Sequence, residues 1–268
     1  MTFPGAHFAR NLVRSRSLIY QLVRRDFEQR YVGSIAGWLW GVIHPLVLLA
    51  VYTFVFSYAF GQRLPAGEVT DSYPLFLLAG MLPWLLFSET LQRSAPALAD
   101  YSNLIKKSVF PPEVVPLSIF LSNLVSHLLA VALLLGATLV HSGRLGAATL
   151  ILPAYLALLG LLSLGLSWIV SALHVYVRDT AQVLAVGLTA WFWLTPIFLS
   201  ESRLGELLPG VVRFNPLTYF VRGYRESVLG GRLPSPWDFL ILAGFGAGAF
   251  LLGGLFFRHT KRGFADVL

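Results

Sequence analysis

The chain has no cysteine among its 268 residues, which excludes disulfide bonds and thiolate metal sites. Charged residues are scarce at 12% of the sequence, whereas a soluble globular domain has about 25%. The sequence also lacks the motifs G-x-x-x-x-G-K-[ST], H-E-x-x-H and G-x-S-x-G, which mark phosphate-binding loops, zinc proteases and serine hydrolases. We therefore expect no enzyme, no ATPase site and no bound metal or cofactor in this chain.

Long apolar runs fill the chain instead, and hydrophobic residues make up 56% of it. A helix needs about 20 mainly apolar residues to cross a ~30 Å hydrocarbon core. These runs are too long for barrel strands and lack their alternating pattern. The sequence therefore predicts an all-α integral membrane protein, a single domain over residues 1–268 with six transmembrane helices. The expected spans are residues 35–60, 73–97, 114–140, 147–177, 181–199 and 239–257.

The distribution of basic residues predicts the orientation of these spans. The net charge is +7, and all three lysines fall on the side that holds the amino terminus. Cytoplasmic loops are enriched in lysine and arginine. We therefore expect a multi-pass protein of the inner (plasma) membrane with both termini cytoplasmic. Because the basic residues cluster in short loops, the positive charge does not indicate a nucleic-acid partner.

Two segments on the predicted cytoplasmic side are not spans. Residues 17–31 have the pattern of an amphipathic helix, which we expect to lie in the inner interface against membrane lipids. Residues 98–110 combine apolar and basic side chains in an inner loop. Apolar groups exposed beside lysines favour a docking surface for another protein, although an ordinary inner loop with orienting lysines is the alternative. The candidate docking residues are Leu104, Ile105, Lys106, Lys107, Arg24 and Arg25.

The outer segment before the last span, residues 200–231, is unusually apolar for a loop. Its glycines and prolines divide it into two helices that are each too short to cross a membrane. Such a pair is typical of a short re-entrant hairpin, which requires cover by protein or a water-filled cavity. We also expect Arg222 and Glu226 to pair on one helix. The residues predicted to form this hairpin's working surface are Arg213, Asn215, Pro216, Tyr219, Arg222 and Tyr224.

Two further patterns occur inside the predicted spans. Glu89 and Arg93 are four residues apart in the second span, a spacing that predicts an ion pair on one helix face. Such a pair has either a functional role or a structural one close to the inner interface. In the last span, Gly244 and Gly248 form a G-x-x-x-G pattern that favours close helix packing.

Five runs of the sequence resemble the polysaccharide-export permeases of ABC transporters. They are RRDFEQRYVGSIAGWLWGVIHPL, LAGMLPWLLFSETLQRSAPAL, NLIKKSVFPPEVVPLS, WFWLTPIF and NPLTYFVRGYRESVLGG. The resemblance implies a homodimer that works with two copies of a cytoplasmic ATP-binding subunit, which holds the ATP and Mg. It also implies an interfacial helix at residues 17–31, a coupling helix within residues 98–110 and outer gate helices within residues 200–231.

The function that this resemblance implies is export of a lipid-linked polysaccharide, with O-antigen as the first candidate. Flat aromatic rings suit sugar faces, so we expect an aromatic pathway between protomers. One alternative is a permease of the same type for a drug or small lipid. Another is a membrane-embedded glycosyltransferase or polymerase, which would need acidic residues gathered at one surface. The candidate pathway residues are Tyr52, Phe56, Phe60, Trp191 and Trp193.

Overall fold

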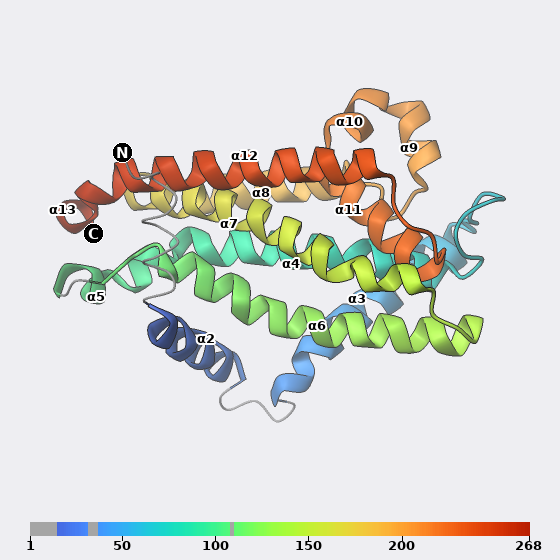
Figure 1. The fold of residues 1–268 in the computed structure, drawn as a ribbon, viewed down its shortest axis with the longest axis horizontal. Coiled ribbons are helices and arrows are strands. Elements are labelled where there is room, and N and C mark those ends of the chain that lie inside the picture. The colour runs from blue at the N-terminus through green and yellow to red at the C-terminus, as the bar shows by residue number, and fades with distance from the viewer. Residues whose placement is uncertain (1–14, 32–36, 108–109) are drawn as a thin grey trace.

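The computed structural model describes residues 15–31, 37–107 and 110–268. All regular structure in these ranges is helical (Figure 1), which confirms the all-α prediction. The helices are α2 (Arg16–Tyr31), α3 (Trp40–Thr53), α4 (Tyr73–Asp100), α5 (Ser102–Lys107), α6 (Val114–Ser142), α7 (Leu152–Tyr176), α8 (Thr180–Trp193), α9 (Glu201–Leu207), α10 (Pro209–Phe214), α11 (Pro216–Tyr224), α12 (Pro236–Thr260) and α13 (Phe264–Val267).

Five helical stretches are long and apolar enough to cross a membrane. They are Trp40–Ala59, Tyr73–Asp100, Val114–Ser142, Ala147–Tyr176 and Pro236–Gly263. These stretches match five of the six predicted spans.

The remaining predicted span, residues 181–199, is a shorter helix than expected. Helix α8 has 14 residues, which extend about 21 Å at 1.5 Å per residue and fall short of the ~30 Å core. Turns follow up to Ser200. The physical reason is Pro196, because proline disfavours helical geometry in the preceding residue and supplies no N–H for the helix.

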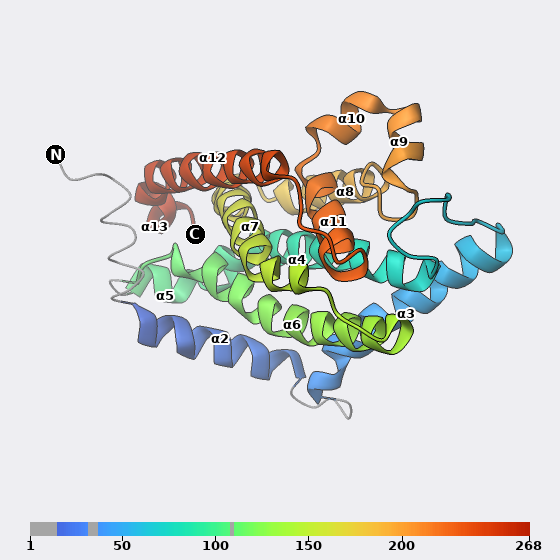
Figure 2. The same cartoon turned by 45° about the vertical axis from the view of Figure 1, so that its right-hand side comes forward.

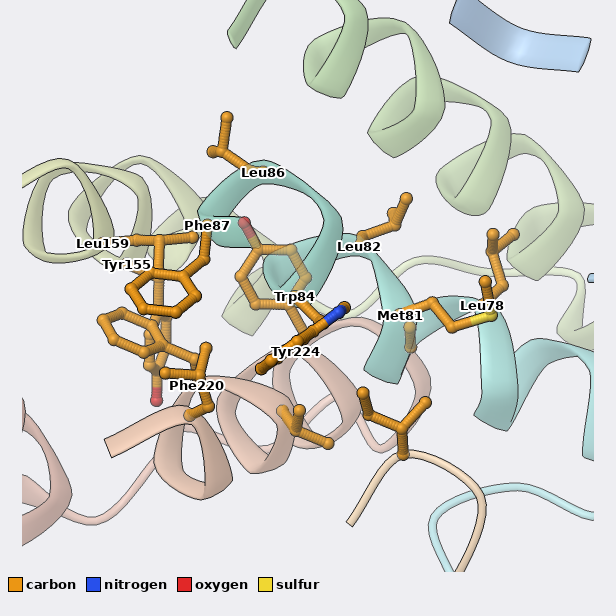
Figure 3. Close-up of a cluster of buried hydrophobic side chains, with 14 of the residues drawn as sticks. Leu78, Met81, Leu82, Trp84, Leu86, Phe87, Tyr155, Leu159, Phe220 and Tyr224 are labelled. Atoms are coloured by element: carbon orange, nitrogen blue, oxygen red, sulfur yellow. The ribbon is translucent and has the colours of Figure 1, made fainter. Parts of the chain in front are cut away.

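Helix α4 lies at the centre of the bundle and is buried along most of its apolar length, whereas, among the described residues of α3, Pro45 is the one that is buried. A helix that is apolar all round lies either in a protein core or in lipid, and other helices surround α4. Figure 3 shows the result: side chains of α4 such as Trp84 and Phe87 meet Tyr155 of α7 and Phe220 and Tyr224 of α11. The core therefore joins the central helix to the segment predicted as an outer hairpin.

The elements that are not spans lie at the two ends of the bundle. Figures 1 and 2 both show α5 and α13 at one end, with α9 and α10 at the other. Helix α2 packs against α6 in the half of the bundle that holds α5. The predicted docking segment and the predicted outer hairpin therefore lie at opposite ends, with α4 running between them.

Helices α7 and α12 pack closely through glycines other than the predicted pair. A Cβ added to Gly244 or Gly248 would meet nothing within 4 Å, so these glycines do not form the contact within this chain. A Cβ on Gly253 of α12 would instead lie 2.0 Å from the main-chain oxygen of Gly165 on α7. The contact between α7 and α12 is therefore made through Gly165, Gly246 and Gly253.

Replacing Gly253 with alanine should therefore force α7 and α12 apart and destabilise the protein by about 1–3 kcal/mol. The matched control is Gly248→Ala on the same helix, which adds its methyl group in open space and should be neutral or slightly stabilising. Thermal unfolding of the purified protein in detergent measures both effects. Equal melting temperatures for the two variants would contradict the assigned packing.

Candidate functional site

An aromatic cleft lies between α3, α4 and α8. It encloses about 320 Å³. Its wall combines the rings of Tyr52, Trp84, Phe192 and Trp193 with aliphatic side chains that include Met81. A surface of this kind offers ring faces to a guest without a charged group that would fix one orientation.

The predicted pathway residues are only partly brought together here. Tyr52 and Trp193 line the cleft, and Phe56 lies one helical turn beyond Tyr52. Phe60 is 74% exposed and meets the ring of Phe56 at 6.1 Å. Trp191 turns away into the core.

Trp191 contacts the ring of Phe87 at 5.2 Å and donates a hydrogen bond to Asn215 at 2.9 Å. It therefore links α8 to the hairpin and does not line the cleft.

Phe198 is the aromatic residue that sequence reasoning missed. It is only 4% exposed, and its ring stacks on Phe56 at 4.6 Å. It also meets Tyr52 at 4.9 Å and Phe192 and Trp193 at 5.1 Å each. Its position in the run WFWLTPIF was a signal, but the assumed continuous span gave no reason to separate it from its neighbours.

The cleft has one open side within this chain. Exposed apolar side chains run along the outer faces of α3 and α8 on both sides of it. A membrane helix can leave such a face to lipid or to a second protein. These side chains are Val47 and Val51 on α3, Phe54 and Tyr58 on the π-helical turn that continues it, and Val183 and Val186 on α8.

Helix α11 leads from α9 and α10 at one end of the bundle back against the core. Its residues are almost all buried, and Tyr224 shares a 2.9 Å hydrogen bond with His127 of α6. Pro216 occupies the first turn, where the missing N–H costs nothing. Asn215 caps this turn by accepting from the N–H of Leu217 at 3.0 Å and donates to the main chain of Leu194 at 3.2 Å.

Arg222 joins three helices of the outer end. It was expected to pair with Glu226, but its guanidinium binds Glu201 of α9 and, at 2.7 Å, Asp238 of α12. The hydroxyl of Tyr219 donates to the main-chain oxygen of Arg213 at 2.8 Å. Arg222 and Tyr219 therefore stabilise the hairpin internally, whereas the Arg213 side chain is exposed.

The predicted pair between Glu89 and Arg93 is wrong. Arg93 lies 2.5 Å from Asp26, and Glu89 lies 2.9 Å from Arg30. Both arginines also donate to the side-chain oxygen of Asn123. Helix α2 thus supplies the partners of both α4 charges, and the network fixes α2 against α4 and α6.

A groove of about 560 Å³ at the same end contains part of the predicted docking set. Arg25 and Leu104 line it together with Asp26 and Arg93. Ile105, which also belongs to α5, packs instead against a second apolar cluster that includes residues of α12 and α13.

The remaining docking candidates lie away from this groove. Lys106 is exposed, and Arg24 pairs with Glu28 at 2.7 Å. The side chain of Lys107 lies outside what the structure describes.

These features define a multi-pass helical membrane protein with an aromatic cleft, short helices packed at one end of the bundle and a charged network at the other. The model of the ABC-2 type transporter family matches residues 17–229, and the chain belongs to this family. It is 27% identical to the O-antigen export system permease protein RfbA of Myxococcus xanthus over 259 residues, or 96% of this chain and 97% of the relative.

Two further relatives match nearly as much of the chain. RfbA of Klebsiella pneumoniae is 26% identical over 253 residues, which are 94% of this chain and 95% of that protein. The polysialic acid transport protein KpsM of Escherichia coli is 25% identical over 243 residues, which are 90% of this chain and 92% of KpsM.

The charge network gives a direct prediction for the half-buried pair of Asp26 and Arg93. A double-mutant cycle with Asp26→Asn and Arg93→Gln should show a coupling of about 1–2 kcal/mol. The control cycle with Arg24→Gln and Glu28→Gln on the same helix should show no measurable coupling, because solvent screens that exposed pair. Thermal unfolding in detergent measures both, and equal coupling in the two cycles would refute the anchoring role.

Proposed function

We propose that this chain is the permease subunit of an ATP-driven exporter that moves a lipid-linked polysaccharide, with O-antigen first, across the inner membrane. The observation that carries the proposal is the aromatic cleft. Its rings can slide along successive sugar faces because stacking requires no particular hydroxyl pattern. Similarity to RfbA along 96% of the chain supports O-antigen as the cargo.

A second copy of the chain would complete the pathway. The cleft is open on one side, and the exposed apolar faces of α3 and α8 border that opening. A homodimer that joined these faces would enclose two facing aromatic walls and cover the apolar residues. Homodimers of this kind place the pathway on the two-fold axis.

ATP would act through two copies of a separate subunit at the inner end, and this chain would bind no cofactor of its own. The partner, with its ATP and Mg, would dock in the groove between α2 and α5, where Arg25 and Leu104 lie. Helix α2 is bound to α4 through Asp26 and Arg93. Movement of α2 or α5 would therefore reach the central helix that lines the cleft.

The membrane placement follows from the same proposal. The turns after α8, residues 194–200, would complete a sixth crossing, and α2 would lie in the inner interface with both termini cytoplasmic. The segment from α9 to α11 would be the outer gate. The exposed Arg213 would be free to meet phosphate groups there, whereas Arg222 would hold the gate helices together.

The export function predicts that the aromatic wall is required for transport but not for folding. Trp193→Ala should lower ATP-dependent export of lipid-linked O-antigen about tenfold, because a large contact surface for sugar is lost. The control is Trp237→Ala, which removes another exposed tryptophan at the start of α12, outside the cleft. Export from vesicles containing the permease and its ATPase gives the measurement, and equal export by both variants would reject the proposed pathway.

The docking proposal predicts a different defect. Leu104→Asp should prevent co-purification of the ATP-binding subunit, because a carboxylate would enter an apolar part of the groove. Leu207→Asp makes the same change at an exposed leucine of α9, at the opposite end, and should leave the complex intact. Retention of the subunit by the Leu104 variant would move the docking site elsewhere.

A further inference from the structure

Arg225 is a buried cation at the outer end of the bundle. It follows α11 directly, begins a π-helical turn and is only 5% exposed. Its three hydrogen bonds within the described residues all go to main-chain oxygens, those of Phe76 (3.2 Å), Pro196 (2.7 Å) and Ile197 (2.7 Å). Its guanidinium also lies 3.3 Å from the centre of the Phe76 ring.

These hydrogen bonds connect three segments of the chain that share no secondary-structure element. Phe76 belongs to α4, Pro196 and Ile197 form the turn after α8, and Arg225 moves with α11. A buried guanidinium is costly to desolvate unless oxygen atoms replace its water. The turn and the arginine therefore depend on each other.

The same turn carries Phe198 to the outer end of the aromatic cleft. The main-chain oxygen of Phe198 accepts two hydrogen bonds, one from the amide of Gln62 at 2.9 Å and one from the hydroxyl of Tyr73 at 3.2 Å. Its ring contacts Tyr52 and Trp193, which line the cleft. Phe198 thus packs against lining rings at the end of the cleft nearest the turn after α8.

We infer that Phe198 is a plug at the outer end of the cleft and that Arg225 is the positioning residue that holds this plug closed. This inference rests on the proposed pathway. A displacement of α11 would withdraw Arg225 from the oxygens of Pro196 and Ile197. The turn would then lose its donors, and Phe198 would leave its ring contacts.

Gly80 offers a way to disturb Arg225 without removing its charge. A Cβ added to Gly80 would lie 2.7 Å from Nη2 of Arg225, so Gly80→Ala should displace the guanidinium. Gly136→Ala is the matched control, because a Cβ there would meet nothing within 4 Å.

The test uses a single cysteine, since the chain has none of its own. Met81 lines the cleft and is 1% exposed, so Met81→Cys reports whether the cleft is open. The full-length protein in the cell membrane is treated from outside with a membrane-impermeant thiol reagent. With Phe198 and Arg225 intact, labelling should be slow.

Phe198→Ala, Arg225→Gln and Gly80→Ala should each raise the labelling rate about tenfold, because the rate follows the population of the open form. Gly136→Ala should leave it unchanged. Should Arg225→Gln fail to fold, Gly80→Ala tests the same contact. An unchanged rate in Phe198→Ala would overturn the plug, and an increase in that variant alone would overturn the role of Arg225.

A cysteine at Leu159, which is fully buried in the core and does not line the cleft, separates opening from general loosening. Its labelling should stay slow in every variant, and a parallel rise would overturn the inference. The assay needs neither substrate nor ATP. A protein that shows this labelling pattern but exports no polysaccharide would therefore refute the proposed cargo and leave the plug in place.

Discussion

The main-chain oxygens of the turn after α8 impose the constraint on which this end of the bundle depends. Helix α8 ends at Trp193, and the carbonyls of Leu194, Pro196 and Phe198 in the turn that follows are not part of a helical hydrogen-bond ladder. Inside an apolar bundle no water replaces them, and each unsatisfied group would cost several kcal/mol. Side chains from other elements supply the donors: Asn215, Arg225, Gln62 and Tyr73.

This requirement explains why α11 enters the bundle. Asn215 and Arg225 lie at the two ends of α11, and each reaches the turn after α8. Between them, Phe220 and Tyr224 fill the core beside α4. The hairpin is consequently a structural part of the cleft, and a movement of α11 alters the cleft's outer end.

The inner half depends on ion pairs in a similar way. Asp26 and Arg30 of α2 pair with Arg93 and Glu89 of α4. Because α4 also carries Tyr73 and Phe76 at its outer end, one helix connects the inner charge network to the turn after α8. The same helix therefore contacts both the charge network and the turn after α8.

Hydropathy was sufficient to locate five spans, because lipid solvation leaves a strong trace in sequence. The glycines and prolines of residues 200–231 predicted two short helices, whereas the structure has three, α9, α10 and α11. Local patterns failed where the partner came from elsewhere in the chain. The four-residue spacing predicted an ion pair between Glu89 and Arg93, whereas in the structure both residues pair with side chains of α2. Pro196 lies inside the predicted fifth span. The hydrogen bonds that Arg225 donates to the carbonyls of this turn are known only from the three-dimensional structure. Ile105 looked exposed because the residues of α12 and α13 that cover it are distant in sequence.

Contact between the cleft and the glycan during transport is the most direct test of the account. A photoreactive benzoylphenylalanine at Tyr52, in the complex with its ATPase stalled by a non-hydrolysable ATP analogue, should form a covalent adduct with labelled lipid-linked polysaccharide. The same probe at Phe245, which is partly exposed on α12, should react with lipid only. Polysaccharide adducts at both positions, or at neither while export proceeds, would contradict a pathway through the aromatic cleft.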